Sequence, residues 1–220
     1  MLKSEYALLE MKKYAVVGGI DEVGKGPFAG PVVAACVVFD RETLETLPGD
    51  LHLVNDSKKL SESMRRYLSD LICQHALQVS IGVGRVDEIN DRGADAATGF
   101  AMYRAWVSCD PRPDILLIDG RDEPPIDVPM RMMVKGDGRE FIIAAASVVA
   151  KHWRDSVMIE VHKRYPEYGL KNNKGYGTPQ HIDSLKDHGY VPGLHRPYYF
   201  RRRKGIRPRK DTVMDWKGMF

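Results

Sequence analysis

The sequence predicts an α/β fold in which a mixed β-sheet is flanked by helices. Short apolar runs rich in β-branched residues predict strands, and longer segments repeat apolar residues at helical spacing. Three strands dominate the first part of the chain, and a helix, two strands and a long helix follow them. With 220 residues, of which 43% are hydrophobic, the chain is long enough for one substantial core.

The first half of the chain contains three of the expected strands. The runs YAVVGGI and PVVAACVVF, residues 14–20 and 31–39, flank a glycine-rich turn and predict two consecutive strands. Residues 61–77 begin with Ser and Glu and carry apolar residues at near-helical spacing, so we expect a helix there. The alternating segment at residues 78–86 predicts the third strand.

The second half predicts the remaining elements. Residues 86–107 are rich in Ala and helical in character. The buried run at 114–120 and the run at 130–136 predict a fourth and a fifth strand. Apolar residues over 142–157 keep to one helical face for about four turns, and a short helix is expected near 180–188.

The positive charge of the chain is concentrated at its C-terminal end. Residues 201–220 hold eight Lys or Arg and two Asp, so a chain of net charge +3 has a body of net charge −3. We therefore expect one folded domain over residues 1–200 and a basic tail over 201–220. A polyanion-binding extension has this composition, and so does a solvated, disordered terminus.

Neither a membrane span nor a signal peptide is expected. No apolar run approaches the ~20 residues that cross a bilayer, and charges are scattered through the N-terminal segment. The three cysteines are far apart in sequence and form no C-x-x-C pair, which favours reduced thiols. We expect a cytoplasmic protein.

Carboxylates stand at the ends of two predicted strands. Asp21 and Glu22 end the first, and Asp119 ends the fourth. Ligands of open α/β sheets gather where strands end, so these acids could meet and repel one another. A divalent cation would remove that penalty, and oxygen ligands suit Mg²⁺ or Mn²⁺ rather than zinc. Each acid alone could instead be a solvent-facing turn residue.

The residues after the first two acids favour a turn that can approach a ligand. Neighbouring side chains of a strand face opposite sides, so the strand must bend or end for Asp21 and Glu22 to reach one metal. The following segment, VGKGP, supplies the turn residues. Its glycines would bring backbone amides and Lys25 close to an anion, for which phosphate is the best candidate.

Five motifs, in order, resemble those of bacterial and archaeal ribonuclease HII, the type 2 ribonucleases H. They span about residues 14 to 198 and are GIDEVGKGPFAGPVV, NDSKKLS, LLIDG, VKGDGREFIIAAASVVAKHWRD and KGYGT. The resemblance implies a ribonuclease H-like fold. It also implies an enzyme that hydrolyses the RNA strand of RNA–DNA hybrids and cuts 5′ of ribonucleotides embedded in duplex DNA. A two-metal-ion mechanism would leave 5′-phosphate and 3′-hydroxyl ends.

The resemblance assigns four catalytic, metal-binding acids, namely Asp21, Glu22, Asp119 and Asp137. The strand pattern indicates the first three independently. Asp137 is different, because in the segment DGRE it also fits a helix N-cap with Glu140 as its capping-box partner.

The resemblance also implies a set of substrate-binding residues: Gly24, Lys25, Gly26, Lys58, Lys59, Ser147 and Tyr176. The glycine–basic–glycine loop would read the ribose 2′-hydroxyl and the adjoining phosphate. Family members commonly carry Arg where this chain has Lys25. Lysine keeps the positive charge of Arg but cannot bind a phosphate in its bidentate manner. Tyr176 would stack on the sugar beyond the ribonucleotide, and the two lysines would contact phosphate. Ser147 lies among small residues that would equally allow close helix–sheet packing.

The expected partners are nucleic acids. We expect a monomer that binds RNA–DNA hybrids and ribonucleotide-containing DNA duplexes. The terminal apolar cluster of Trp216, Met219 and Phe220 is faintly similar to clamp-binding tails, which leaves two roles for it: a weak clamp contact or docking on the body. Two other functions fit the sequence less well. A non-catalytic protein that only binds hybrids would not need four mutually repelling acids. A small-molecule phosphatase would have no use for Tyr176 or for the basic tail.

Overall fold

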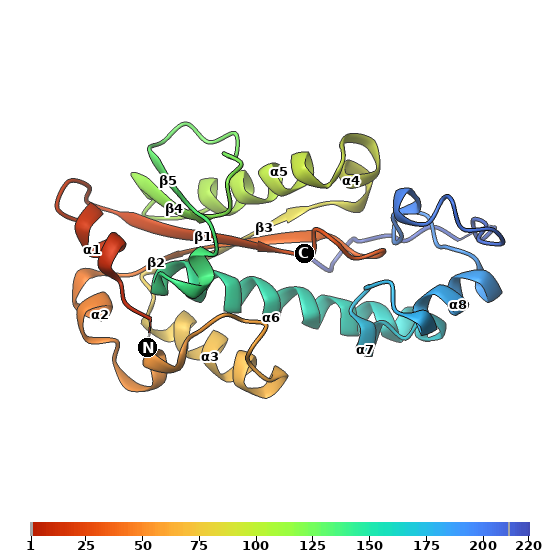
Figure 1. Cartoon of the computed structure of the whole chain (residues 1–220), viewed down its shortest axis with the longest axis horizontal. Helices are drawn as coiled ribbons and strands as arrows, with labels where there is room; N and C mark the ends of the chain where they lie inside the picture. Colours follow the sequence, from red (N-terminus) through yellow and green to blue (C-terminus); the bar gives the residue numbers. More distant parts are fainter. Residues whose placement is uncertain (1, 211) are drawn as a thin grey trace. The chain divides into compact units, whose positions relative to one another are not determined.

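A five-stranded sheet forms the centre of the fold in the computed structural model, which describes residues 2–210 and 212–220 (Figure 1). Its strand order is β3-β2-β1-β4-β5. β1 pairs antiparallel with β2 and parallel with β4, and β4 pairs parallel with β5, so the predicted mixed sheet is confirmed. The strands are β1 (Val17–Val23), β2 (Val32–Val38), β3 (Gln78–Gly84), β4 (Ile115–Asp119) and β5 (Met130–Met133).

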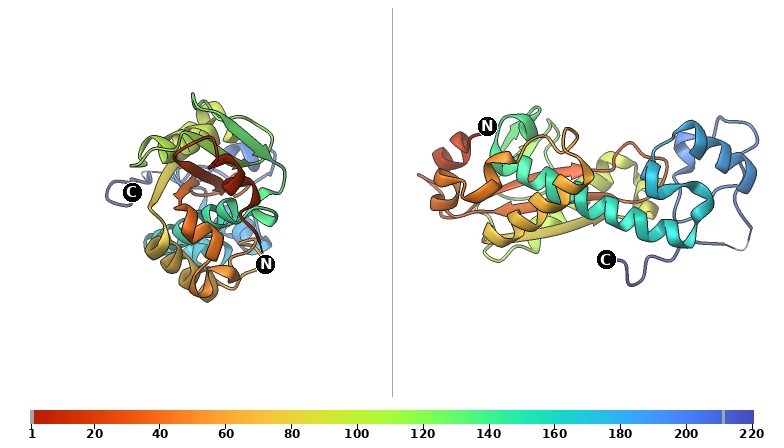
Figure 2. Two further views of the ribbon diagram at one scale, coloured as in Figure 1. Left: turned by 90° about the vertical axis from the view of Figure 1, so that its left-hand side faces the viewer. Right: turned by 90° about the horizontal axis from the view of Figure 1, so that it is seen from below.

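Helices lie on both faces of this sheet. Figures 1 and 2 show α5 on one face, with α3 and the first half of α6 on the other. No helix of the described residues has the length and apolarity to cross a bilayer. The helices are α1 (Glu5–Glu10), α2 (Arg41–Thr46), α3 (Glu62–His75), α4 (Val86–Arg92), α5 (Ala94–Val107), α6 (Phe141–Arg164), α7 (Leu170–Asn173) and α8 (Pro179–His188).

Two helical predictions need correction. The segment 86–107 forms two helices, because Gly93 adopts φ +89° and ends α4. The long helix α6 continues to Arg164, and its first half does not keep one apolar face. Residues 142–150 are buried on every side of α6, since the sheet and neighbouring segments enclose it.

The glycines of β1 allow α6 to pack very close to the sheet. A Cβ atom built on Gly19 would lie 2.5 Å from the carbonyl oxygen of Ile142, in the first turn of α6. Only a residue without a side chain fits such a contact. β1 and α6 are thereby held in direct contact at the point where each carries a candidate site residue.

The chain forms two compact units. The first comprises Met1–Val23, Val33–Val83 and Thr98–His152, and it contains most of the sheet. The second comprises Gly24–Val32, Gly84–Ala97 and Trp153–Phe220.

The second unit has an apolar core of its own. This core contains the buried residues Tyr168, Leu170, Leu185, Val191, Leu194, Phe200 and Met214. It is built mainly from α7, α8 and the segments that follow them, and the last part of α6 contributes Val157, Met158 and Val161.

The C-terminal segment packs on the second unit. Met214 is buried in that core, and the Trp216 indole N–H donates to the Gly193 carbonyl at 2.8 Å. Phe220 stacks on Trp216 and on Trp153, with ring centroids 5.2 and 5.8 Å apart. Of the two roles open for the terminal apolar cluster, docking on the body is the one that this arrangement shows. The boundary at residue 200 stays a prediction, and Met1 and Asp211 lie outside the described residues.

Candidate active site

Asp21 and Asp119 lie at the same level of two adjacent parallel strands. The pairing of β1 with β4 ends at Ile20 and Ile118, and each acid is the next residue of its strand. The expectation that β1 ends at its acids is wrong, because Asp21 and Glu22 remain paired with β2. What ends there is the pairing with β4. The two acids thus lie just past the last paired residues of β1 and β4.

The Asp21 carboxylate is buried among other negative charges. Its side chain accepts the N–H of Glu22 at 2.7 Å and a hydrogen bond from Ser147. Burial raises the pKa of Asp21 well above its usual range, the charges of Glu22 and Asp119 raise it further, and the two hydrogen bonds oppose the shift. An ionised Asp21 is therefore destabilised unless a cation balances it.

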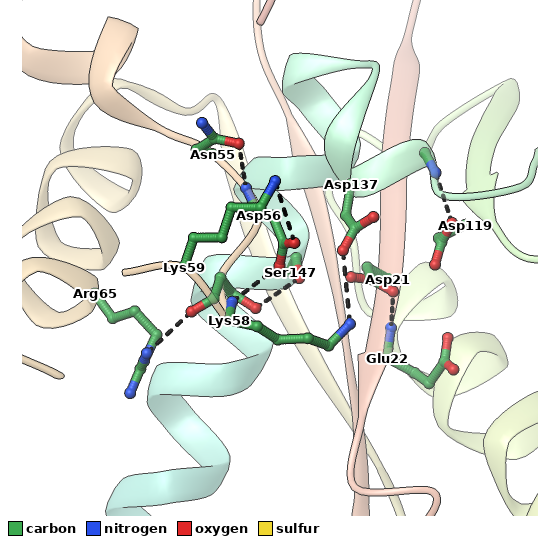
Figure 3. A network of polar contacts seen from close by, with 12 residues as sticks. Asp21, Glu22, Asn55, Asp56, Lys58, Lys59, Arg65, Asp119, Asp137 and Ser147 are labelled. Atoms are coloured by element: carbon green, nitrogen blue, oxygen red, sulfur yellow. Dashed lines mark hydrogen bonds and ion pairs between the residues drawn. The ribbon is translucent and has the colours of Figure 1, made fainter. Parts of the chain in front are cut away.

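Asp119 at the end of β4 is joined to the turn after β5, which carries Asp137. The Asp119 carboxylate accepts the N–H of Gly136 at 2.7 Å, and Gly136–Gly138 is a short 3₁₀ helix that carries Asp137. Burial and the charge of Asp119 raise the pKa of Asp137, while Lys58 opposes the shift. Figure 3 shows the carboxylates of Asp21, Asp119 and Asp137 grouped together.

The capping-box alternative for Asp137 does not match the structure. α6 begins at Phe141, so Asp137 is too far from its first turn to be the N-cap. The Glu140 carboxylate accepts the N–H of Tyr6 at 3.1 Å instead of returning to Asp137. Asp137 is thus placed by the 3₁₀ turn.

The two neighbouring lysines behave differently. The Lys58 ammonium lies 3.8 Å from the Asp137 carboxylate, whereas that of Lys59 lies 3.7 Å from Asp56 (Figure 3). Partial desolvation lowers the pKa of Lys58, but the surrounding carboxylates, led by Asp137, raise it more. Lys58 therefore belongs to the acidic cluster, and Lys59 turns away from it.

Ser147 connects α6 to the site. Its hydroxyl lies 3.0 Å from that of Ser57 and hydrogen-bonds to Asp21, and both serines are buried. Ser147 is more than a small packing residue, because it joins the lysine-bearing loop, α6 and β1 at one point.

The donor chemistry of this cluster fits a hard divalent cation. Asp21, Glu22, Asp119 and Asp137 supply only carboxylate oxygens, and the pKa values of Asp21 and Asp137 are raised by burial and by neighbouring carboxylates. Within 2–210 and 212–220, however, no three His, Cys, Asp or Glu side chains are arranged to hold an ion. Small side-chain rotations would be needed to bring the oxygens to a common point.

The glycine loop and Tyr176 lie in the second unit, and neither is part of the acidic cluster described above. The Lys25 ammonium forms an ion pair with Asp95 at 2.5 Å, and the Tyr199 hydroxyl donates to the Lys25 carbonyl at 2.8 Å. The Gly175 carbonyl accepts the N–H of Phe28 at 2.8 Å. The loop that carries Tyr176 therefore lies beside the glycine loop.

The two glycines of this loop are glycine for different reasons. Gly24 is buried at φ +94°, and a Cβ atom there would lie 2.3 Å from the Nε of Arg154. Gly26 is exposed, and a Cβ atom there would have no atom within 4 Å. Packing therefore requires Gly24, whereas Gly26 leaves open space on the side of solvent.

A pocket of about 550 Å³ in the second unit includes this loop. Lys25 and Gly26 line it together with Asn90, Tyr198 and Tyr199, among others. Tyr176 is 42% exposed, so its ring is available for stacking. An open glycine, a cation and exposed aromatic rings make a surface suited to a sugar–phosphate chain.

Sequence reasoning missed two functional candidates, Arg154 and Arg196. Both are fully buried in the second unit and donate to backbone carbonyls of residues 24–31, the segment that is called the glycine loop from here on. Arg154 lies within the fourth of the five motifs, beside Trp153 in the apolar pattern of α6, and Arg196 lies outside all five. A surface arginine at a helix edge gives the same pattern.

Comparisons with known proteins show the family of this chain. A family model for ribonuclease HII matches residues 18–202. The chain is 43% identical over 190 residues to ribonuclease HII of Clostridioides difficile, covering 86% of this chain and 72% of the relative. Ribonuclease HII of Chlorobium luteolum is 46% identical over 190 residues, with 86% and 90% covered. The crystal structure of ribonuclease H2 from Pyrococcus horikoshii has a TM-score of 0.71 and 26% identity, covering 86% of this chain and 96% of that one.

Proposed function

This chain belongs to the ribonuclease HII family and is thus a metal-dependent endoribonuclease acting on RNA–DNA hybrids; we propose that it also cuts 5′ of single ribonucleotides in duplex DNA. We further propose a two-metal-ion mechanism that leaves 5′-phosphate and 3′-hydroxyl ends. The observation that supports the mechanism is the buried Asp21 carboxylate, whose pKa is raised by burial and by the charges of Glu22 and Asp119.

Asp21, Glu22, Asp119 and Asp137 would hold the ions in this proposal, with Mg²⁺ or Mn²⁺ as the metal. When bound, the ions would activate the attacking water and stabilise the leaving 3′-oxygen. The chain's own contribution is orientation: Gly136 fixes the Asp119 carboxylate and Ser147 fixes that of Asp21. Lys58, beside Asp137, would bind the phosphate of the substrate strand.

Recognition of the ribonucleotide would fall to the second unit. An exposed glycine allows backbone groups to come within hydrogen-bond distance of a 2′-hydroxyl, which is what distinguishes RNA from DNA. Gly26 is exposed in this way, and the neighbouring Lys25 ammonium would trade its ion pair with Asp95 for a phosphate. Tyr176 would stack on the deoxyribose beyond the ribonucleotide.

The test is cleavage of a labelled DNA duplex with one ribonucleotide, beside an all-DNA duplex and an RNA–DNA hybrid, with Mg²⁺ or Mn²⁺ supplied in turn. We expect the first and third substrates to be cut and chelation to stop both reactions. A parent enzyme that cuts the hybrid but leaves the single-ribonucleotide duplex intact would contradict the proposal.

Asp21→Asn and Asp119→Asn test the assigned acids. Each should reduce cleavage to background in saturating metal, while Asp21→Asn should leave the melting temperature unchanged or raise it because a buried repulsive charge disappears. Asp122→Asn is the matched control, since Asp122 is an exposed acid just beyond β4. Near-parental turnover by either active-site variant would remove that residue from the metal site.

The remaining partner and location assignments stay predictions: a monomer, a cytoplasmic location and a weak clamp contact through Trp216, Met219 and Phe220. The stacking of Phe220 on Trp216 and Trp153 bears on the last of these. A clamp contact through this cluster would require the C-terminal segment to leave its own unit.

A further inference from the structure

Two arginines that the proposed mechanism does not use lie inside the second unit. Arg154 on α6 and Arg196 are both 0% exposed. Burial lowers the pKa of Arg154, and burial together with the charge of Arg154 lowers that of Arg196 to about 9, so both remain cationic at neutral pH. Two neighbouring buried cations are costly to retain, which points to a specific use.

The hydrogen bonds of Arg154 connect two loops. Its guanidinium donates to the carbonyls of Pro31 and Ala29, at 2.9 and 3.0 Å, at the end of the glycine loop. It also donates to the carbonyl of Lys174 at 3.0 Å, two residues before Tyr176. One planar, rigid side chain thus fixes the glycine loop and the tyrosine loop at the same time.

The backbone contacts of Arg196 all go to the glycine loop, and its guanidinium also hydrogen-bonds to the Tyr199 side chain. Its guanidinium donates to the carbonyls of Gly24, Lys25 and Gly30, at 2.8, 3.0 and 2.9 Å. The two arginines therefore share one loop, and only Arg154 adds the Lys174 contact. This difference makes Arg196 a natural comparison for Arg154.

The contacts with both loops go to backbone carbonyls. The arginines therefore hold the loops through the main chain rather than through the side chains at the surface. The absence of a side chain at Gly24 is part of the arrangement, since a Cβ atom there would clash with the Arg154 guanidinium. The positions of Gly26 and of the Tyr176 backbone consequently depend on the same buried group.

We propose that Arg154 is a positioning residue that sets the spacing between the glycine loop and Tyr176, and through it the preference for a ribonucleotide followed by deoxyribose. The inference rests on the proposed function, in which the glycine loop reads the 2′-hydroxyl and Tyr176 reads the next sugar. Arg154 itself is fully buried and would not touch the substrate. Misplacement of a recognition group by about 1 Å can lower turnover as much as about 100-fold.

The experiment measures kcat and KM on two substrates, the duplex with one ribonucleotide and the RNA–DNA hybrid. Arg154→Lys keeps the charge but replaces the fork of N–H donors by a single ammonium. The two loops then lose their shared side-chain support and keep the backbone hydrogen bonds of Phe28 and Ala29 to the Gly175 carbonyl. We expect kcat/KM on the single-ribonucleotide duplex to fall at least about tenfold more than on the hybrid, mainly through kcat. Arg196→Lys should lower kcat/KM by similar factors on the two substrates, because the glycine loop contacts both.

Two controls separate positioning from general destabilisation. Leu185→Ala removes a buried side chain from the apolar core of the same unit and should lower the melting temperature without changing the ratio of the two substrates. If Arg154→Lys does not fold, Arg154→Ala is assayed with and without millimolar guanidinium. The added guanidinium should occupy the space left by the arginine side chain and restore the parental ratio of kcat/KM on the two substrates.

The outcomes distinguish this inference from the proposed function. A parent enzyme that does not cut the single-ribonucleotide duplex contradicts the proposed function. Another outcome is that the parent cuts this duplex while Arg154→Lys lowers kcat/KM on both substrates by the same factor, as is expected of Leu185→Ala. In that case Arg154 is a stabilising residue only, and the inference is overturned. The same conclusion follows if guanidinium raises activity on both substrates equally.

Discussion

At the scale of single residues, Gly24 and Gly26 belong to one loop but respond to different constraints. Gly26→Ala should leave the free energy of unfolding within about 0.5 kcal/mol of the parent, because nothing lies within 4 Å of the new methyl group. The same methyl group would stand where the 2′-hydroxyl is expected, so kcat/KM should fall on every ribonucleotide-containing substrate. Thermal unfolding and cleavage assays measure the two effects separately.

Gly24→Ala is the contrasting variant. It should lower the free energy of unfolding by about 1–3 kcal/mol, since it adds strain at φ +94° and a clash with Arg154.

Parental cleavage rates for Gly26→Ala would mean that the substrate does not approach the backbone at that position.

Glu140 gives stability a pH dependence near neutrality. Burial raises its pKa from 4.5 to about 7, and its Oε1 has no hydrogen-bond partner among the described residues. Between these two pKa values the folded chain binds a proton that the unfolded chain releases, so the free energy of unfolding falls as pH rises from 4.5 to 7. Glu140→Gln should remove most of this fall, which is on the order of 2–3 kcal/mol. Chemical denaturation at several pH values measures it, and parallel curves for the two proteins would contradict it.

Side chains that act through strand ends were predictable, and those that act through burial were not. Asp21, Glu22 and Asp119 follow apolar runs, and that pattern is visible in one dimension. The use of Arg154 depends on carbonyls more than a hundred residues away in the chain, which no local pattern reveals. Asp137 fell between these cases, since its segment alone favoured a helix N-cap and only the family resemblance made it a metal ligand.

At the scale of elements, sequence patterns located the five strands and the longer helices, but not their interruptions or the short helices α1, α2 and α7. The five strands appear where β-branched runs predicted them. A run of apolar residues does not show with which neighbour the pairing of a strand ends first. The sequence therefore did not reveal that the pairing of β1 with β4 ends at Ile20. The helical character of 86–107 similarly concealed the break at Gly93, because a single glycine is often tolerated within a helix.

The contact between β1 and α6 can be tested by one methyl group. Gly19→Ala would place a Cβ atom 2.5 Å from the Ile142 carbonyl, so the helix would have to move away from the strand. We expect the free energy of unfolding to fall by about 1–3 kcal/mol and cleavage to weaken, because Ser147 on α6 would shift relative to Asp21. Gly138→Ala, which meets nothing within 4 Å, is the control for unfolding. A Gly19→Ala protein as stable as that control would show that the contact is loose.

At the scale of the whole molecule, the charge of the tail and the packing of the tail must be tested apart. Deleting 201–220 would remove Met214 from the core of the second unit as well as the basic residues. Replacing the exposed Arg201, Arg202, Arg203 and Lys204 by Gln leaves Met214 in place and changes the net charge from +3 to −1, with the loss of one cation–π contact, that of Arg201 with Tyr198. We expect weaker binding of nucleic acid and a shallower dependence of log K on log salt, by up to about 0.9 for each phosphate that is no longer neutralised.

The control is a second variant that has the same net charge but loses its four positive charges outside the tail. Gln at the exposed Lys12, Lys13, Arg41 and Arg66 also removes four positive charges. Titrations at two salt concentrations compare the variants. Equal slopes for the two sets would assign the attraction to net charge, and an effect confined to the tail set would assign it to the tail.

The aromatic stack at the C-terminus also gives the second unit an optical signal. Two of the three tryptophans, Trp153 and Trp216, lie in that stack with Phe220, whereas Trp106 belongs to the first unit. In a Trp106→Phe protein, fluorescence emission would therefore report on the second unit alone. A red shift of that emission at a lower denaturant concentration than the loss of far-UV circular dichroism would show that the C-terminal segment detaches before the sheet melts.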